Sequence, residues 1–259
     1  MANNETTVNI DMQANKQRFL QIFKDKIKRD GADKLLEWLC KSDFFEAPAS
    51  SKFHNAVRGG LCDHSLNVYD RVVALVETEK AYERQRAVGK AIAERRAELT
   101  TGLIPNLNLD VAKVEKIIQK EIAEGKFNVG GDMPTLFDNV SEENIAVAAL
   151  LHDLCKIDYY KISQRNQKNE VTGQWEKVDY YSIDEALPYG HGEKSVYIIS
   201  GFMRLERKEA MAINWHMGGF DKRVVGGDFS LSKAFEQYPF ATLVHIADIM
   251  STYFDEGRG

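Results

Sequence analysis

The chain of 259 residues is 44% hydrophobic and 28% charged, which is ordinary for a globular protein and long enough to bury a sizeable core. Its net charge is -5, and it has neither a strongly basic stretch nor an apolar run near the roughly 18 residues of a membrane span. These properties argue against a membrane protein and against binding of long nucleic acid. The polar N-terminus lacks the apolar segment of a signal peptide, and the three cysteines form no CxxC pair, so we expect a cytoplasmic protein.

The N-terminal part of the chain is predicted to be helical. Apolar residues recur at helical spacing over 13–29 and 32–41, so we expect a helical extension spanning 13–41. A double glycine at 59–60 then predicts a sharp change of backbone direction. Directly after it, Asp63 is placed to cap a long helix that runs to about residue 98.

The block over 81–140 reads as a helical insertion. Residues 81–100 are charged nearly all round, which is typical of a solvated helix. A second helix is expected over 108–124, and Gly125 ends it. Glycines and a proline over 126–140 predict a loop that closes the block.

A strongly apolar helix is predicted at the centre of the fold. Ser141 is a favourable N-cap, and Glu142 and Glu143 lie in the first turn, where the helix dipole favours negative charge. The residues that follow are apolar on nearly every side, up to His152 and Asp153. We therefore expect this helix to be buried.

The helical pattern is interrupted after this helix. Residues 157–183 contain two runs rich in Tyr, Ile, Val and Trp around a polar tip, which predicts a β-hairpin. Further helices are expected over 192–205, 207–216 and 239–254. Together these elements predict an all-α single domain over 1–259, with about eight helices and one small hairpin.

Potential metal ligands lie at the end of the central helix. A buried helix rarely carries an adjacent imidazole and carboxylate, here His152 and Asp153, unless they are paired or bind a metal. The two oxygens of Asp153 could also bridge two metal ions. Lys156 follows one helical turn after His152, where its ammonium would face an anion held by the metals.

Three later segments place similar side chains in similar settings. Asp248 lies in a mostly apolar helix, where a buried carboxylate requires a cation. His191 lies between two glycines at the start of a helix, and His216 ends an apolar helix before two glycines. His245 shares a helix face with Asp248, and we expect it to support the site or the core rather than to bind metal directly.

These segments occur in an order that resembles the HD superfamily of metal-dependent phosphohydrolases, including the HD domains of bacterial 3′-to-5′ exoribonucleases and prophage HD hydrolases. The segments that carry the resemblance are Phe53-His54-Asn55-Ala56, Gly59-Gly60-Leu61 with Asp63-His64, His152-Asp153-Leu154-Cys155-Lys156, Gly190-His191-Gly192-Glu193, Trp215-His216-Met217-Gly218-Gly219 and His245-Ile246-Ala247-Asp248. The resemblance covers about 45–255 apart from 81–140. It implies an HD-domain helical bundle, with the β-hairpin near the active site. Because the N-terminal region reads as helices and not as the small β-barrel with which those exoribonucleases grip RNA, long RNA is not expected as the substrate.

The resemblance also implies a binuclear metal centre. One ion would be held by His64, His152, Asp153 and Asp248, and the second by Asp153, His191 and His216. A set of nitrogen and oxygen ligands without thiolate favours Mn or Fe, with Co, Ni or Zn as alternatives. The implied activity is a metal-dependent phosphohydrolase or phosphodiesterase that uses activated water on a nucleotide, a dinucleotide or a short oligonucleotide. A homo-oligomer is compatible with the sequence.

Basic side chains near these segments are candidates for contacts with the substrate. Lys156 and Arg58 could stabilise the charge of a phosphate, and His54 could protonate the leaving oxygen. Arg165 and Lys177 lie in the predicted hairpin and could select a base or a second phosphate. The ordinary alternatives are a surface histidine, a salt-bridged arginine and a hairpin that packs or dimerises.

Two other classes of protein are alternatives to a phosphohydrolase. Some HD-fold proteins hold a mixed-valence di-iron site and act as oxygenases on small polyols or phosphonates. Such an activity would need iron and O2 and would be lost when Mn replaces iron. The third class is a sensor module with a degenerate metal site, which would purify without two equivalents of metal.

Overall fold

The computed structural model describes residues 10–100, 110–127 and 133–256, and it is mostly helical with one two-stranded antiparallel sheet. The chain divides into two compact units. One comprises the chain up to Leu75 and from Val140 onward, and the other comprises Val76–Asn139. The second unit overlaps the block over 81–140 for which the sequence predicts a helical insertion.

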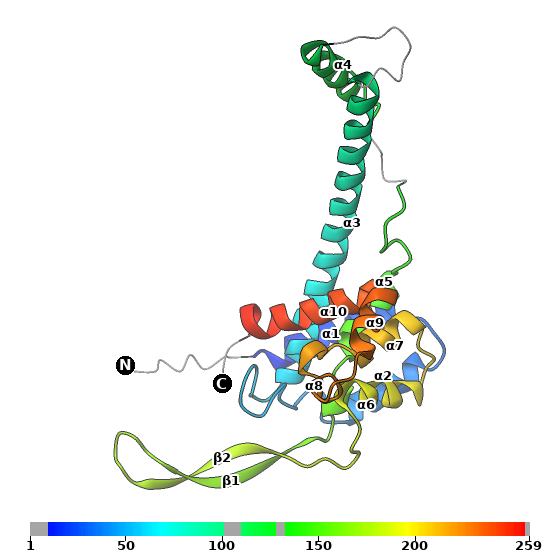
Figure 1. Ribbon diagram of the computed structural model, residues 1–259. Helices are drawn as coiled ribbons and strands as arrows, with labels where there is room; N and C mark the ends of the chain where they lie inside the picture. The colour runs from blue at the N-terminus through cyan, green and yellow to red at the C-terminus, as the bar shows by residue number, and fades with distance from the viewer. Residues whose placement is uncertain (1–9, 101–109, 128–132, 257–259) are drawn as a thin grey trace. The chain divides into compact units, whose positions relative to one another are not determined.

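The first unit contains most of the helices, which pack together in one body (Figure 1). Its helices are α1 (Met12–Lys26), α2 (Ala32–Lys41), the first part of α3 (Gly60–Thr100), α5 (Glu142–Leu151), α6 (His191–Ser200), α7 (Arg207–Asn214), α8 (Lys222–Val225), α9 (Ser230–Gln237) and α10 (Pro239–Met250). Short 3-10 turns occupy Leu154–Lys156 and Gly218–Phe220, and a π-helical turn over Ser251–Asp255 extends α10. The helices α8 and α9 are absent from the sequence-based prediction.

The helix α5 lies at the centre of the first unit, as its apolar sequence predicts. The hydroxyl of Ser141 accepts a hydrogen bond from the backbone of Asn144, whose side chain accepts one from the backbone of Ser141, so the predicted cap is a full capping box. Every residue from Asn144 to Leu151 is buried. Since α5 packs against α1 and α7, it carries His152 and Asp153 into the interior.

A buried ion-pair network joins the start of α5 to the start of α7. Arg29 donates two hydrogen bonds of 2.7 Å to Glu209 and one of 3.2 Å to Glu143. Asn144 donates to the same Glu209 carboxylate over 2.7 Å. The side chain of Glu209 is fully buried, so its charge depends on these donors.

The entry to α3 differs from the prediction. The helix begins at Gly60, so Asp63 lies in its first turn and does not cap it. The carboxylate of Asp63 instead accepts hydrogen bonds from Asn15 and Asn55, over 2.7 and 2.8 Å. Gly59 has a φ of +81°, and a Cβ on Gly60 would lie 2.1 Å from the backbone oxygen of Asn55. Both glycines are therefore required by the turn.

The predicted hairpin is confirmed. Strands β1 (Tyr160–Lys168) and β2 (Trp175–Ile183) pair antiparallel, with Tyr160 opposite Ile183. Figure 1 shows them as a twisted ribbon that extends away from the helices of the first unit. Most of their side chains are exposed, so the hairpin contributes little to the core.

The second unit contains the remainder of α3 and the helix α4 (Val111–Ala123). Leu99, Val114 and Ile118 form its buried apolar cluster. The first two positions of the predicted helix over 108–124 lie outside the described residues. Among the residues that the structure describes, no helix has both the length and the apolarity needed to cross a membrane.

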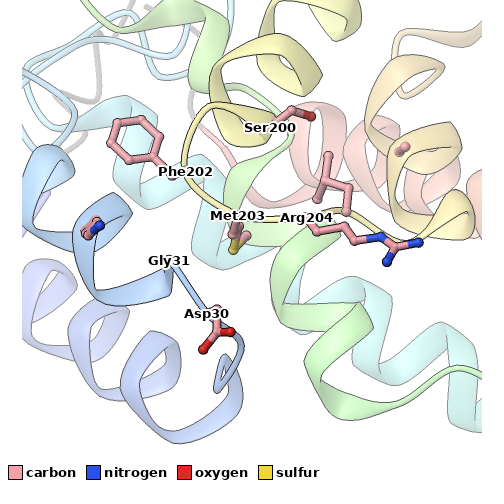
Figure 2. A pocket seen from close by; sticks show the side chains of 9 residues that line it. Asp30, Gly31, Ser200, Phe202, Met203 and Arg204 are labelled. Carbon is pink, nitrogen blue, oxygen red and sulfur yellow. The ribbon is translucent and has the colours of Figure 1, made fainter.

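A shallow cavity of about 710 Å³ lies where the start of α2 meets the segment after α6 (Figure 2). Gly31 has a φ of +89°, and a Cβ there would overlap the backbone oxygen of Phe202. The charged residues in the lining are Asp30, Lys34 and Arg204, and the lining contains neither histidine nor cysteine. This cavity is therefore separate from the potential metal ligands.

Candidate metal centre

Three histidines from different helices meet in the interior of the first unit. His64 lies in the first turns of α3, His152 directly follows α5, and His216 lies two residues after α7. The Nε2 atoms of His64 and His152 are 3.1 Å apart, and the rings of His152 and His216 have centroids 4.9 Å apart. All three side chains are buried. Packing of the helices thus brings together residues that lie far apart in the sequence.

Two of these rings are fixed by backbone carbonyl groups. The Nδ1 atom of His152 lies 2.8 Å from the oxygen of Ala149, and that of His216 lies 2.7 Å from the oxygen of Ile213. Because a carbonyl oxygen only accepts, Nδ1 carries the hydrogen in both rings. In the neutral rings the lone pair is then on Nε2, which points toward the centre of the cluster.

Two carboxylates face these nitrogens. Asp153 places Oδ1 at 3.4 Å from Nε2 of His216 and Oδ2 at 3.4 Å from Nε2 of His152. Asp248 places Oδ1 at 3.2 Å from Nε2 of His64. Asp153 therefore turns one oxygen toward each part of the cluster, which is the arrangement expected of a carboxylate that bridges two ions.

His191, the first residue of α6, joins the cluster on the side of Asp153. Ligand atoms of Asp153, Cys155 and His191 lie within 4.8 Å of one another. Burial, followed by the charge of Lys156, lowers the pKa of His191 to about 4, so the ring is neutral at neutral pH. Burial raises the pKa of the Cys155 thiol above its usual range, which disfavours a thiolate ligand.

The cluster attracts positive charge. Burial lowers the pKa of His64, but Glu256 and Asp248 outweigh burial and raise it to about 10. Burial raises the pKa of Asp153, but Lys156 and the neighbouring imidazoles outweigh burial and hold it well below its usual range. Buried carboxylates that draw protons onto an imidazole also favour a metal cation at the same place.

The donor atoms fit metal ions in both type and spacing. Two ligands at right angles, each about 2.1 Å from a metal, lie about 3 Å apart. The distances from Nε2 of His64 to His152 and to Asp248 are 3.1 and 3.2 Å. Nε2 of His216 is buried and has no hydrogen-bond partner among the described residues. Since unpaired buried acceptors are costly, a cation among them would supply the missing interaction.

Lys156 brings a positive charge to the same place. Its Nζ lies 2.6 Å from Oδ2 of Asp153, and the side chain is almost fully buried. Burial lowers the pKa of Lys156, but Asp153 outweighs burial and raises it above its usual range. Lys156 is therefore charged at neutral pH.

A cavity of about 840 Å³ opens onto the cluster. Asp153, Lys156, His191 and Asp248 are in its lining, so potential ligands are accessible from this side. Three aromatic side chains in the lining have large exposed surfaces: Phe53, Phe220 and Tyr253 are 71%, 64% and 57% exposed. The cavity thus combines a polar floor with an aromatic mouth.

The two remaining histidines also line this cavity. The ring of His54 lies 5.1 Å from that of His64, and its Nε2 is buried without a hydrogen-bond partner among the described residues. Burial, followed by the charges of His64 and Lys156, lowers the pKa of His54 to about 4. His245 binds the backbone oxygen of His216 through Nδ1 over 2.6 Å, and its ring lies where a Cβ on Gly218 would be.

Three predicted substrate contacts lie outside the cavity. Arg58 forms an exposed ion pair with Glu46 over 2.8 Å, which is the ordinary alternative for this residue. Arg165 lies over the ring of Tyr180, 5.4 Å from its centroid, and Lys177 is exposed on β2. None of the three lines the cavity: the hairpin contributes only its base, through Tyr160 and Ile183, and Arg58 is paired with Glu46 at the surface.

The structure also brings in a residue that sequence reasoning missed. Glu256 is buried, and its Oε1 lies 2.7 Å from Nδ1 of His64. It follows three exposed residues, Tyr253, Phe254 and Asp255, so no pattern of buried residues marks it. Comparisons of the chain with protein-family models, with curated proteins and with solved structures give no match. The candidate site therefore stands on its geometry.

Proposed function

We propose that this chain is a metal-dependent phosphohydrolase of the HD type, which cleaves a phosphoester in a nucleotide or a short oligonucleotide. One observation carries the proposal: three imidazoles and two carboxylates, held by α3, α10 and the ends of α5 and α7, converge on a buried point beside a cavity. The order of these residues along the chain supports the HD assignment. The chemistry of the donor atoms supports Mn or Fe over softer metals.

In the proposed hydrolysis, each residue of the site has a separate role. Two divalent ions bound here would activate a water molecule and offset the charge of the phosphoryl oxygens. Asp153 would hold both ions through its two oxygens. Lys156 would hydrogen-bond a non-bridging oxygen of the substrate while it stays paired with Asp153. His54 would accept or donate a hydrogen bond as a neutral ring at the cavity wall.

The lining of the cavity supports a substrate with an aromatic base. Phe53, Phe220 and Tyr253 offer exposed rings at its mouth. Stacking of a base on an aromatic side chain contributes about 1–3 kcal/mol. The lysines in the lining are Lys52 and Lys156, and the latter already pairs with Asp153. A lining with three exposed aromatic rings and only two lysines favours a substrate with a base and one reacting phosphate over a substrate with a polyphosphate chain.

The test is hydrolysis of bis-p-nitrophenyl phosphate by the purified protein with added Mn. We expect turnover that needs the metal and that is lost in Asp153→Ala. Asp70→Ala is the matched control, because Asp70 forms an exposed ion pair with Arg18 in the same unit. Absence of turnover with Mn, Fe, Co and Ni, together with consumption of O2 by the iron-loaded protein, would replace the hydrolase with an oxygenase.

A further inference from the structure

The side chain that orients His64 lies in the last described segment of the chain. We infer that Glu256 is a positioning residue: it holds the imidazole of His64 in the tautomer and orientation that present Nε2 to the metal, and it strengthens that nitrogen as a ligand. This inference rests on the proposed metal centre and adds to it a residue outside the resemblance.

The contact itself is a short hydrogen bond in a fully buried setting. Nδ1 of His64 lies 2.7 Å from Oε1 of Glu256, and the side chains are 1% and 0% exposed. A carboxylate only accepts when ionised, so Nδ1 of His64 carries the hydrogen, and Nε2 is left to face His152 and Asp248. A buried carboxylate without such a partner would be costly.

The fold brings Glu256 to this place through a specific segment. After α10 the chain makes a π-helical turn over Ser251–Asp255, which the backbone N–H of Glu256 closes on the oxygen of Ser251 over 3.1 Å. Asp255 forms a two-point ion pair with Arg71 of α3, at the outer side of the segment. The ring of His64 is thus held end to end between Asp248 of α10 and Glu256.

His64 differs in this respect from the other two central histidines. His152 and His216 donate from Nδ1 to neutral carbonyl groups, whereas His64 donates to an ionised carboxylate. A carboxylate partner raises the basicity of a metal-bound imidazole more than a carbonyl does, and its loss typically costs about 10–100-fold in metal affinity. We therefore expect the ion held by His64 to depend on Glu256.

A direct role of Glu256 as a ligand fits the geometry less well. Ligand atoms of His54, His64 and Glu256 lie within 4.8 Å of one another, a spacing that also fits a metal ion. However, the 2.7 Å contact is a normal hydrogen-bond length and is shorter than the separation of about 3 Å between neighbouring ligands of one metal. The hydrogen bond is the simpler account.

The experiment compares Mn binding by the full chain and three variants, using titration calorimetry and metal analysis after dialysis. Glu256→Gln keeps an oxygen that accepts from Nδ1 but removes the charge, and Glu256→Ala removes both. Asp255→Asn is the matched control, because it weakens the ion pair with Arg71 in the same segment and leaves His64 untouched. In the Zn-loaded proteins, the NMR signal of the His64 Nδ1 hydrogen reports the contact directly.

We expect two Mn ions in the wild type. The affinity of one of them should fall about tenfold in Glu256→Gln and up to about 100-fold in Glu256→Ala, with no change in Asp255→Asn. The low-field signal of the Nδ1 hydrogen should disappear in Glu256→Ala. Equal Mn affinity in all proteins, equal losses in Asp255→Asn and Glu256→Gln, or a third ion that is lost with Glu256 would each overturn the inference. A wild type that binds no Mn would instead remove the proposed function.

Discussion

The rings of His152 and His216 lie edge to face, with centroids 4.9 Å apart, and each donates from Nδ1 to the carbonyl group three residues before it. The helices that lead to them are joined at their other ends as well, where Asn144 donates to Glu209. The helices α5 and α7 are thus connected at both ends. The positions of these two potential ligands are therefore set by helix packing and by a buried polar network.

This connection predicts a large effect of Glu209 on stability. Glu209→Ala leaves the guanidinium of Arg29 without its bidentate partner, so the free energy of unfolding should fall by about 3 kcal/mol, measured by urea denaturation. The double variant Arg29→Met/Glu209→Leu should lose less free energy of unfolding than Arg29→Met and Glu209→Leu lose in sum. Additive losses would contradict the proposed coupling.

The same network predicts a pH dependence of stability. Burial raises the pKa of Glu143, but hydrogen bonds from Arg29 and from the backbone of Lys28 outweigh burial and lower it. Its contribution is therefore present above the usual carboxyl range and is lost as the pH falls through the lowered value. Glu143→Gln should be less stable than the wild type at pH 7, and this gap should close under acid conditions. A gap that widens in acid would contradict the assignment.

A third prediction separates metal binding from stabilisation of the phosphate. Lys156→Met should keep its bound metal, because an ammonium is not a ligand, while kcat should fall about 100–1000-fold through loss of a charged donor. Steady-state kinetics and metal analysis of the same sample provide the measurement. Lys52→Met serves as the control, since Lys52 is an exposed residue of the lining and should change KM more than kcat. An unchanged kcat in Lys156→Met would contradict a role of Lys156 in stabilising the phosphate.

The aromatic mouth of the cavity predicts a dependence on the substrate. Phe220→Ala should raise KM for a thymidine p-nitrophenyl phosphodiester by about 5–160-fold, because one stacking contact contributes about 1–3 kcal/mol. KM for methyl p-nitrophenyl phosphate, which lacks the base, should change less. Tyr82→Ala, an exposed aromatic outside the cavity lining, is the control. Equal effects on both substrates would argue against a base at this position.

Local patterns in the sequence predict several of the elements. The helix α5 follows from a good N-cap and an unbroken apolar run, and the hairpin follows from two β-rich segments around a polar tip. The short helices α8 and α9 were missed because they lie in or next to residues 218–227, where four glycines are typical of a loop. Asp63 looks like a helix cap, but three-dimensional contacts with Asn15 and Asn55 give it another role.

In the candidate site, too, some features could be predicted from the sequence and others could not. The order of histidines and aspartates predicts which side chains could meet, and His64, His152, Asp153 and His216 do so. Contacts between distant parts of the chain could not be predicted in this way. Arg58 is next to a required glycine in sequence but turns to a surface partner, whereas Glu256 reaches His64 across 192 positions.

The most direct test of the central claim is the number and coupling of bound metal ions. The wild type should retain two equivalents of Mn after dialysis and show the EPR spectrum of two coupled ions, because Asp153 is placed to bridge them. Asp153→Asn should retain at most one equivalent, without the coupled spectrum. A wild type that retains no Mn or Fe, or an Asp153→Asn variant that keeps both coupled ions, would contradict the account.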